Sequence, residues 1–201
     1  NRTNEGMGTV GAAREALLSR QSGGMCFDIH PRDNITYVVG TEDGTVHKYS
    51  KSQNESYVLD YKPHSEPVYR VRWSPFCPDY FLTASADWTS RLYEIEESNP
   101  LATFDSNRQD AVQDLCWSNT NASIFATATS QGHVDLWDVA DQNQPRTTLE
   151  LNRPLNCLVF AEQESPLLTV GDNEGDIFVV KLTGDEFERH GRSDGEQEER
   201  L

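Results

Sequence analysis

FATATSQGHVDLWD, residues 125 to 138, reads as two strands joined by a tight turn. Its first half, Phe125 to Ala128, is short, apolar and rich in small residues, which suits a strand buried on both faces. Ser130, Gln131 and Gly132 follow as the turn, where glycine tolerates the positive φ that a hairpin needs. The second half alternates in polarity and ends in Trp137-Asp138. The segment therefore predicts a β-hairpin.

The same order of segments, a first strand followed by a hairpin, occurs four times along the 201 residues. Each repeat begins with a first run that precedes the hairpin, and Tyr69, Val71 and Trp73 show the alternation of a strand in one of these runs. The four first runs are MCFDIHP (25 to 31), VYRVRWSP (68 to 75), VQDLCWS (112 to 118) and LNCLVFA (155 to 161). The hairpins that follow are YVVGTEDGTVHKYS (37 to 50), FLTASADWTSRLYE (81 to 94), FATATSQGHVDLWD (125 to 138) and LLTVGDNEGDIFVVK (167 to 181).

Two markers measure the period of this repeat. The aromatic residue that closes the first run is assigned to Phe27, Trp73, Trp117 and Phe160, which are 46, 44 and 43 residues apart. The turn position falls at Gly44, Trp88, Gly132 and Gly175, which are 44, 44 and 43 residues apart. A period of roughly 40–45 residues is that of a four-stranded propeller blade. On the same alignment Cys26 and Cys116 precede the closing aromatic in two blades, which favours packing over nucleophilic chemistry.

The sequence therefore predicts an all-β chain built of propeller blades. Weaker outer strands are expected at 57 to 61, 101 to 104 and 147 to 151, because edge strands carry less sequence pattern. WD propellers usually have about seven blades, so we expect the C-terminal four blades of a seven-bladed propeller. The expected segments are a linker or the end of a preceding blade (1–24), blades at 25–62, 63–106, 107–151 and 152–184, and an acidic disordered tail (185–201).

Trp137-Asp138 is the dipeptide that names the WD repeat, and the second repeat carries polar residues where WD repeats place hydrogen bonds. These are His64, Ser85, Asp87 and Thr89. They can tie the hairpin turn back to the loop that leads into the blade and so satisfy buried polar groups. The first and fourth repeats lack both the histidine and the Trp-Asp pair, so we expect apolar packing to hold those blades.

Composition narrows the function classes. The net charge is −16, which repels phosphate backbones and makes nucleic acid a poor partner. The four cysteines have neither zinc-ligand nor disulfide-scaffold spacing, and a reducing compartment fits them. No apolar run approaches the ~20 residues that span a bilayer. Nucleic acid and membrane are therefore not expected as partners.

Catalytic motifs are weak in this sequence. Gly6, Gly8 and Gly11 match G-x-G-x-x-G, but that fingerprint needs a strand before it and a helix after it, and five polar residues precede it. The five histidines are scattered without the close spacing of a metal site. We predict no catalytic, cofactor-binding or metal-binding residue. Trp88, at a hairpin tip where glycine would be less strained, is either a partner anchor or a cover for its own blade.

Several segments together resemble one branch of the WD family. They are CFDIHP (26 to 31), VGTEDG (39 to 44) with His47-Lys48, PVYRV (67 to 71) with Trp73-Ser74-Pro75-Phe76, and SADWT (85 to 89). This combination is similar to dynein intermediate chains, over residues 25 to about 182. It resembles most the axonemal branch, and within it the intermediate chain of the two-headed inner arm.

The resemblance implies a non-catalytic scaffold in the axoneme of cilia and flagella. Its propeller would dock on the tail of a dynein heavy chain, beside a second intermediate chain, with light chains bound through a region absent here. Tyr69, Trp88 and Arg91 are the residues we expect to contact a partner. Two alternatives stay open at this point: a WD adaptor of another complex, such as a ubiquitin ligase or a chromatin assembly, and an enzyme that uses the glycine motif.

Overall fold

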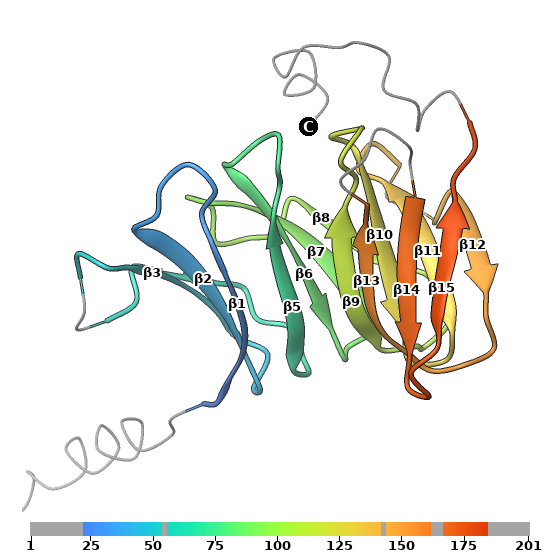
Figure 1. Cartoon of the computed structure of the whole chain (residues 1–201). Helices are drawn as coiled ribbons and strands as arrows, with labels where there is room; N and C mark the ends of the chain where they lie inside the picture. The colour runs from blue at the N-terminus through green and yellow to red at the C-terminus, as the bar shows by residue number, and fades with distance from the viewer. Residues whose placement is uncertain (1–21, 54–55, 142–143, 162–166, 185–201) are drawn as a thin grey trace, which may run out of the picture.

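The computed structural model describes residues 22–53, 56–141, 144–161 and 167–184. The glycine motif at 6–11, most of the expected linker and the expected acidic tail lie outside these residues. Within these ranges, fifteen strands form four antiparallel sheets that stand side by side in an arc (Figure 1). No helix that could span a membrane occurs in the described ranges. The all-β propeller architecture expected from the repeat is confirmed.

Each sheet is one blade, and its strands follow the chain from the innermost to the outermost. Blade 1 contains β1 (Gly24–Ile29), β2 (Thr36–Thr41), β3 (Val46–Ser50) and β4 (Leu59–Tyr61). Blade 2 contains β5 (Val68–Trp73), β6 (Tyr80–Ser85), β7 (Thr89–Glu94) and β8 (Ala102–Asp105). Blade 3 contains β9 (Val112–Trp117), β10 (Ile124–Thr129), β11 (His133–Asp138) and β12 (Thr147–Glu150). Blade 4 contains β13 (Leu155–Phe160), β14 (Leu167–Asp172) and β15 (Ile177–Lys181).

The strand register corrects the alignment of the first repeat. Trp73 pairs with Phe81, Trp117 with Phe125 and Phe160 with Leu168, and the residue in the same place of blade 1 is Ile29, opposite Tyr37. Phe27 was therefore the wrong marker, and Ile29 restores a spacing of 44 residues to Trp73. The error arose because Phe27 is the aromatic residue of its run and Ile29 is aliphatic. By the same register Cys26 corresponds to Cys157, opposite Gly171, and not to Cys116.

Aromatic pairs across the second and third strands form the centre of three blades. Phe81 stacks on Tyr93 with ring centroids 5.3 Å apart, and Phe125 stacks on Trp137 at 6.2 Å. In blade 1, Tyr37 stacks on Tyr49. The fourth blade has Leu168 opposite Val180 in this place. The third-strand residue at this position of each repeat therefore lies against the second strand of its own sheet; these residues are Tyr49, Tyr93, Trp137 and Val180.

The outermost strand of a blade packs on the next blade. Tyr61 of β4 meets Phe81 edge to face at 5.0 Å, and Phe104 of β8 meets Phe125 at 4.9 Å. Both side chains are almost completely buried, and burying an aromatic side chain of this size contributes roughly 1.5–3 kcal/mol. Neighbouring blades are thus joined by continuous apolar cores.

Both end faces of the arc expose positions that are buried elsewhere. Phe27 is 63% exposed, while Val71, in register with it in blade 2, is fully buried. At the other end Val179 is 65% exposed, while Leu136, in register with it in blade 3, is 3% exposed. Stacked blades bury these positions against their neighbours, so each exposed end face has the side-chain pattern of a blade contact.

Candidate functional site

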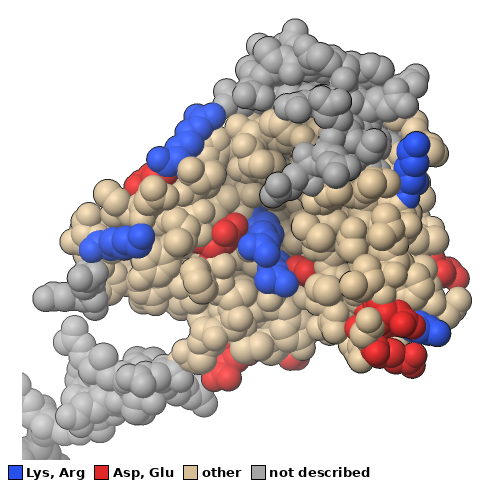
Figure 2. Space-filling view, viewed as in Figure 1, with Lys and Arg blue, Asp and Glu red and all other residues tan. Residues whose placement is uncertain are grey.

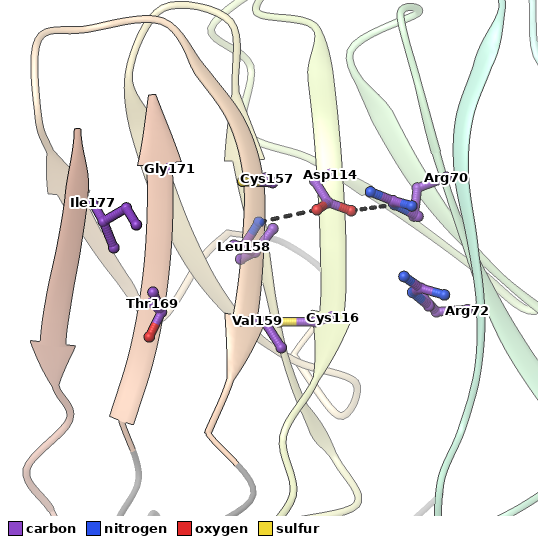
Figure 3. Close-up of a pocket in the computed structure, with 10 residues that line it drawn as sticks. All are labelled: Arg70, Arg72, Asp114, Cys116, Cys157, Leu158, Val159, Thr169, Gly171 and Ile177. Atoms are coloured by element: carbon purple, nitrogen blue, oxygen red, sulfur yellow. Dashed lines mark hydrogen bonds and ion pairs between the residues drawn. The ribbon is translucent and has the colours of Figure 1, made fainter. Parts of the chain in front are cut away.

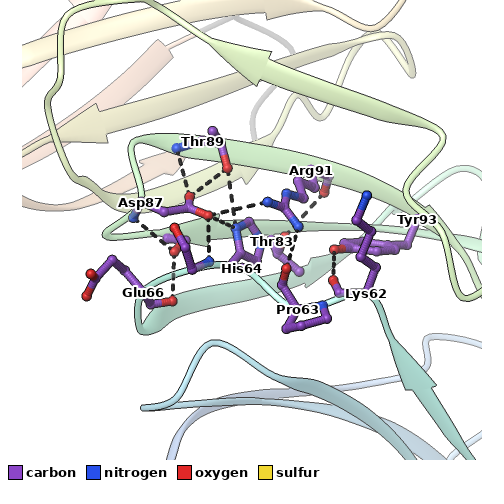
Figure 4. A network of polar contacts seen from close by, with 11 residues as sticks. Lys62, Pro63, His64, Glu66, Thr83, Asp87, Thr89, Arg91 and Tyr93 are labelled. Carbon is purple, nitrogen blue, oxygen red and sulfur yellow. Dashed lines mark hydrogen bonds and ion pairs between the residues drawn. The ribbon is translucent and has the colours of Figure 1, made fainter.

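The best-defined polar site ties the hairpin of blade 2 to its lead-in loop, the loop that precedes the first strand of a blade. His64, in this loop, is surrounded by the hairpin (Figure 4). Its Nδ1 lies 2.9 Å from Oδ2 of Asp87, and its Nε2 lies 2.7 Å from Oγ1 of Thr83. The imidazole has no exposed surface and the Asp87 side chain is 5% exposed. We call this group the blade 2 lock.

The other residues of the blade 2 lock close the turn itself. The Ser85 hydroxyl donates to the Glu66 carbonyl oxygen at 3.1 Å and accepts the Asp87 N–H. Thr89 donates both its N–H and its hydroxyl to Asp87 Oδ1, at 3.1 and 2.6 Å. The sequence predicted hydrogen-bonding roles for His64, Ser85, Asp87 and Thr89, and the structure brings all four together. Thr83, which lies on β6 before the turn, was not predicted.

Burial and hydrogen bonding set the protonation of the two ionisable partners. Burial disfavours the imidazolium and lowers the pKa of His64 despite its bond to Asp87. Burial also opposes ionisation of Asp87, but hydrogen bonds from His64, Thr89 and the Ser65 N–H outweigh it and hold the pKa of Asp87 well below its usual range. At neutral pH the lock therefore pairs a carboxylate with a neutral imidazole that donates from Nδ1, and the Thr83 hydroxyl donates to Nε2.

Two side chains expected to have other roles also belong to this network. Arg91 donates to the Pro63 carbonyl oxygen at 2.9 Å and lies 3.4 Å from Asp87 Oδ2. Tyr93, which replaces the tryptophan of a Trp-Asp pair, donates its hydroxyl to the Lys62 carbonyl oxygen at 2.8 Å. Arg91 was expected to contact a partner, and the structure uses it to join the hairpin to the lead-in loop.

Blade 3 contains a lock of reversed polarity. Here the lead-in loop supplies the carboxylate, Asp110, and the hairpin supplies the imidazole of His133, with Oδ2 and Nδ1 3.0 Å apart. Asp110 also accepts from the Ser130 hydroxyl and the Gln131 N–H. Burial opposes its ionisation, but hydrogen bonds from Thr129, His133, Ser130 and Gln131 prevail and lower its pKa.

Trp137 and Asp138 lie at the far end of the blade 3 hairpin. The Trp137 Nε1–H donates to Oγ1 of Thr127 at 3.1 Å, and Thr127 is the blade 3 equivalent of Thr83. Asp138 forms an ion pair with Arg146 at 2.6 Å and accepts the Ala140 N–H. The dipeptide thus anchors the third strand, while Asp110 and His133 hold the turn.

Blade 4 is locked by arginine. Arg153 of its lead-in loop lies 3.3 Å from a carboxylate oxygen of Asp172 and also pairs with Asp176. Asp172 accepts the N–H groups of Glu174 and Asp176. These three acids could hold a cation, and in the described residues the Arg153 guanidinium already occupies that place. Blade 4 was expected to be held mainly by apolar packing, and the structure adds Arg153, which ties its turn to the lead-in loop as His64 does in blade 2.

The hairpin turn of blade 1 also carries polar contacts. Thr41 and Thr45 hydrogen-bond Asp43 across the turn, and Thr45 lies 3.0 Å from Nε2 of His47. The hydrogen bond from the Thr41 hydroxyl is the main cause that lowers the pKa of Asp43 to about 2, and it outweighs burial, which raises this pKa. The first repeat is therefore also held by polar groups, supplied within its own hairpin.

A pocket of about 510 Å³ lies where the inner strands β5, β9 and β13 meet (Figure 3). Arg70 of β5 pairs with Asp114 of β9, and the other oxygen of Asp114 accepts the Leu158 N–H of β13 at 3.0 Å. Asp114 therefore joins three blades. In the space-filling view, basic side chains with acidic neighbours lie in the central hollow (Figure 2), so this hollow carries charges of both signs.

Two cysteines of the inner strands, Cys26 and Cys116, are poor nucleophiles. Burial raises the pKa of Cys26 to about 11 and raises that of Cys116 further. A thiol attacks as its thiolate, which is scarce at neutral pH when the pKa is this high. These cysteines fill space between the blades.

Tyr69 and Trp88, the other two expected partner contacts, occupy different places. Tyr69 is half-buried at a register shift of β5. Trp88 is 43% exposed at the tip of the blade 2 hairpin, with a φ of 74°. The structure therefore leaves Trp88 as the exposed member of the expected set.

The stacked four-stranded sheets, the repeat of about 44 residues and the locks between hairpin and lead-in loop define a run of WD-type β-propeller blades. The crystal structure of the computationally designed Ika4 protein shares this fold, with a TM-score of 0.68 over 82% of this chain and 94% of that one, at 17% identity. No family model matches the chain.

Axonemal dynein intermediate chain 4 of Xenopus laevis is 47% identical over 163 residues, 80% of this chain, and that of Mus musculus is 40% identical over 84%. A flagellar outer-arm intermediate chain of 78 kDa from Chlamydomonas reinhardtii is 30% identical over 82% of it. The resemblance found in the sequence is confirmed: this chain is homologous to a segment of axonemal dynein intermediate chains. It spans about a fifth of the length of the intermediate chain 4 relatives.

Proposed function

We propose that this chain forms part of a non-catalytic scaffold subunit of an axonemal dynein. Its propeller docks on the tail of a dynein heavy chain and supports the assembly and regulation of ciliary motility. The identity of 47% to an axonemal dynein intermediate chain over 80% of the chain carries this proposal.

The architecture fits a scaffold. Apolar cores run from blade to blade, and each hairpin turn is tied by polar groups. Such an arc holds its loops in fixed relative positions and can present several surfaces at once. Paired groups such as His64 and Asp87 hold the loops in place. Burial raises the pKa of the Cys26 thiol, which makes it a poor nucleophile. These residues therefore support binding.

The subunit in this proposal belongs to the two-headed inner arm and works in the axoneme. Its partners are a dynein heavy chain, a second intermediate chain and light chains, the last bound through a region outside this chain. The negative charge of −16 suits neutral or basic protein surfaces and disfavours nucleic acid.

The test is affinity purification of the full-length tagged protein from ciliated cells, followed by mass spectrometry. We expect dynein heavy chains, light chains and a second intermediate chain. The identity of the heavy chain would show to which dynein arm the subunit belongs. A matched preparation carrying Asp87→Asn, which opens the blade 2 lock, should recover less of them. Recovery of ubiquitin-ligase or chromatin subunits without dynein would reject the proposal and favour the adaptor alternative.

A further inference from the structure

Trp88 has a backbone conformation that the other blades reserve for glycine. Gly44, Gly132 and Gly175 hold the same turn position with φ values of 85°, 98° and 92°, and Trp88 has a φ of 74°. Bulky L-residues rarely adopt the left-handed region, because the side chain crowds the backbone there. A tryptophan that stays in this region despite the strain points to a use for its side chain.

The neighbouring loop is unusual as well. Thr89 pairs with Asp105, so Trp88 lies beside the loop of residues 106 to 110. Asn107 and Gln109 of this loop also have positive φ values, 59° and 52°. At Gly44 an added Cβ would lie 2.4 Å from the His64 carbonyl oxygen of the next lead-in loop. The loop after Trp88 therefore takes a different path, which leaves room for a side chain at this turn.

Trp88 is the most exposed of the four tryptophans. The indole N–H groups of Trp73, Trp117 and Trp137 all donate hydrogen bonds, and these side chains are at most 6% exposed. Trp88 is 43% exposed, and its side chain takes part in no hydrogen bond or ring contact within the described residues. Strain is therefore concentrated at an indole that faces outward.

The loop beside this indole and the hairpin turn of the next blade expose side-chain amides. Asn107, Gln109 and Gln131 are exposed, and Gln131 Nε2 donates to the Gln109 carbonyl oxygen at 3.4 Å. The charged residues of the loop are engaged elsewhere, Arg108 with Asp135 and Asp110 with His133. Side-chain amides both donate and accept, which matches the N–H and C=O groups of a polypeptide backbone. Phosphate recognition would need free cations.

We propose that Trp88 is the anchor of a protein-docking surface at the turn end of blade 2, rimmed by Asn107, Gln109 and Gln131. Its occupant is a polypeptide that offers an apolar pocket for the indole and backbone groups for the amides. Tryptophan is enriched at the energetic centre of such interfaces, and polar residues typically surround it. The inference rests on the proposed function for its choice of partner, another polypeptide of the dynein complex.

The test compares Trp88→Gly with Leu101→Ala in the full-length protein, because Leu101 is similarly exposed, at 49%, at the other end of the same blade. We expect Trp88→Gly to keep or raise the melting temperature, because glycine relieves the strain. Its affinity in the purified complex should fall at least tenfold, and Leu101→Ala should retain it. Unchanged affinity, or a lower melting temperature for Trp88→Gly, overturns the proposal.

A second measurement leaves Trp88 in place. Benzoylphenylalanine is introduced at Gln109, and ultraviolet light should link it to another polypeptide of the purified complex. Absence of an adduct in an intact dynein complex overturns this inference and leaves the proposed function standing. If no dynein is recovered with the full-length protein, the proposed function fails, and the choice of a dynein polypeptide as the occupant fails with it.

Discussion

Replacing Asp87 by asparagine isolates the contribution of the blade 2 lock. The carboxylate accepts from His64 Nδ1 and the Ser65 N–H through one oxygen, and from the Thr89 N–H and hydroxyl through the other. Asparagine keeps one oxygen and replaces the second by an NH₂ donor. If the remaining oxygen serves Thr89, the NH₂ group faces His64 and the Ser65 N–H, so these two close donors lose their acceptor. The Arg91 guanidinium, 3.4 Å from the same oxygen, keeps its hydrogen bond to the Pro63 carbonyl.

The expected loss of stability follows from these two donors, His64 Nδ1 and the Ser65 N–H. A buried polar group that loses its partner costs roughly 1–3 kcal/mol. The imidazole can offset one loss by moving its proton to Nε2, so that Nδ1 accepts from the new NH₂ and Nε2 donates to Thr83, 2.7 Å away. One orphaned donor and the lost charge-assisted bonds remain. We expect Asp87→Asn to lower the free energy of unfolding by about 2 kcal/mol at pH 7.

The pH dependence of the stability difference between the wild type and Asp87→Asn gives the sharper test. The folded-state pKa of Asp87 is below the usual value of 3.8, so its stabilisation is present above that value and is lost as the pH falls through the folded pKa. The wild type and Asp87→Asn should therefore converge at acidic pH. His64, whose pKa is also lowered, reduces stability in both proteins as the pH falls below 6.5, because the unfolded state then binds more protons.

The assay is urea unfolding of the chain, followed by tryptophan fluorescence at pH 7 and pH 3. Asp79→Asn is the matched control, because Asp79 is exposed, and it should change stability by less than about 0.5 kcal/mol. A loss of under about 1 kcal/mol for Asp87→Asn at pH 7, or a difference that does not shrink between pH 7 and pH 3, would refute the reasoning.

Three further predictions concern the turns, the third strand and the thiols. Gly132→Ala should cost more stability than Gly175→Ala in thermal unfolding, because a Cβ at 132 would lie 2.6 Å from Arg153 backbone atoms while none lies within 4 Å at 175; equal losses would contradict this. Thr127→Val should lower the unfolding free energy by about 1–3 kcal/mol, because the Trp137 N–H loses its acceptor, and an unchanged urea midpoint would argue against it. Iodoacetamide at pH 7.5 should label exposed Cys157 well before half-buried Cys116, whose pKa burial raises, and mass spectrometry that finds the reverse order would disprove the packing role.

Local patterns in the sequence were sufficient for the blade architecture. Strand alternation, turn glycines and a repeat of about 44 residues specify four sheets, because each strand carries its own periodicity and each turn its own backbone requirement. They also located most of the blade 2 lock, from His64 to Thr89, since these residues match a known pattern.

Only the tertiary structure decided the remaining assignments. The register placed Ile29 where the sequence suggested Phe27, because pairing depends on which residues face the core and not on which one is aromatic. It also showed that Asp110 with His133, and Arg153 with Asp172, replace the histidine-to-aspartate pair. Partners about 20 residues apart in the sequence meet only when the lead-in loop folds against the hairpin. The attraction is the same whether the loop or the hairpin supplies the carboxylate. No local pattern therefore specifies which of the two residues is the acid.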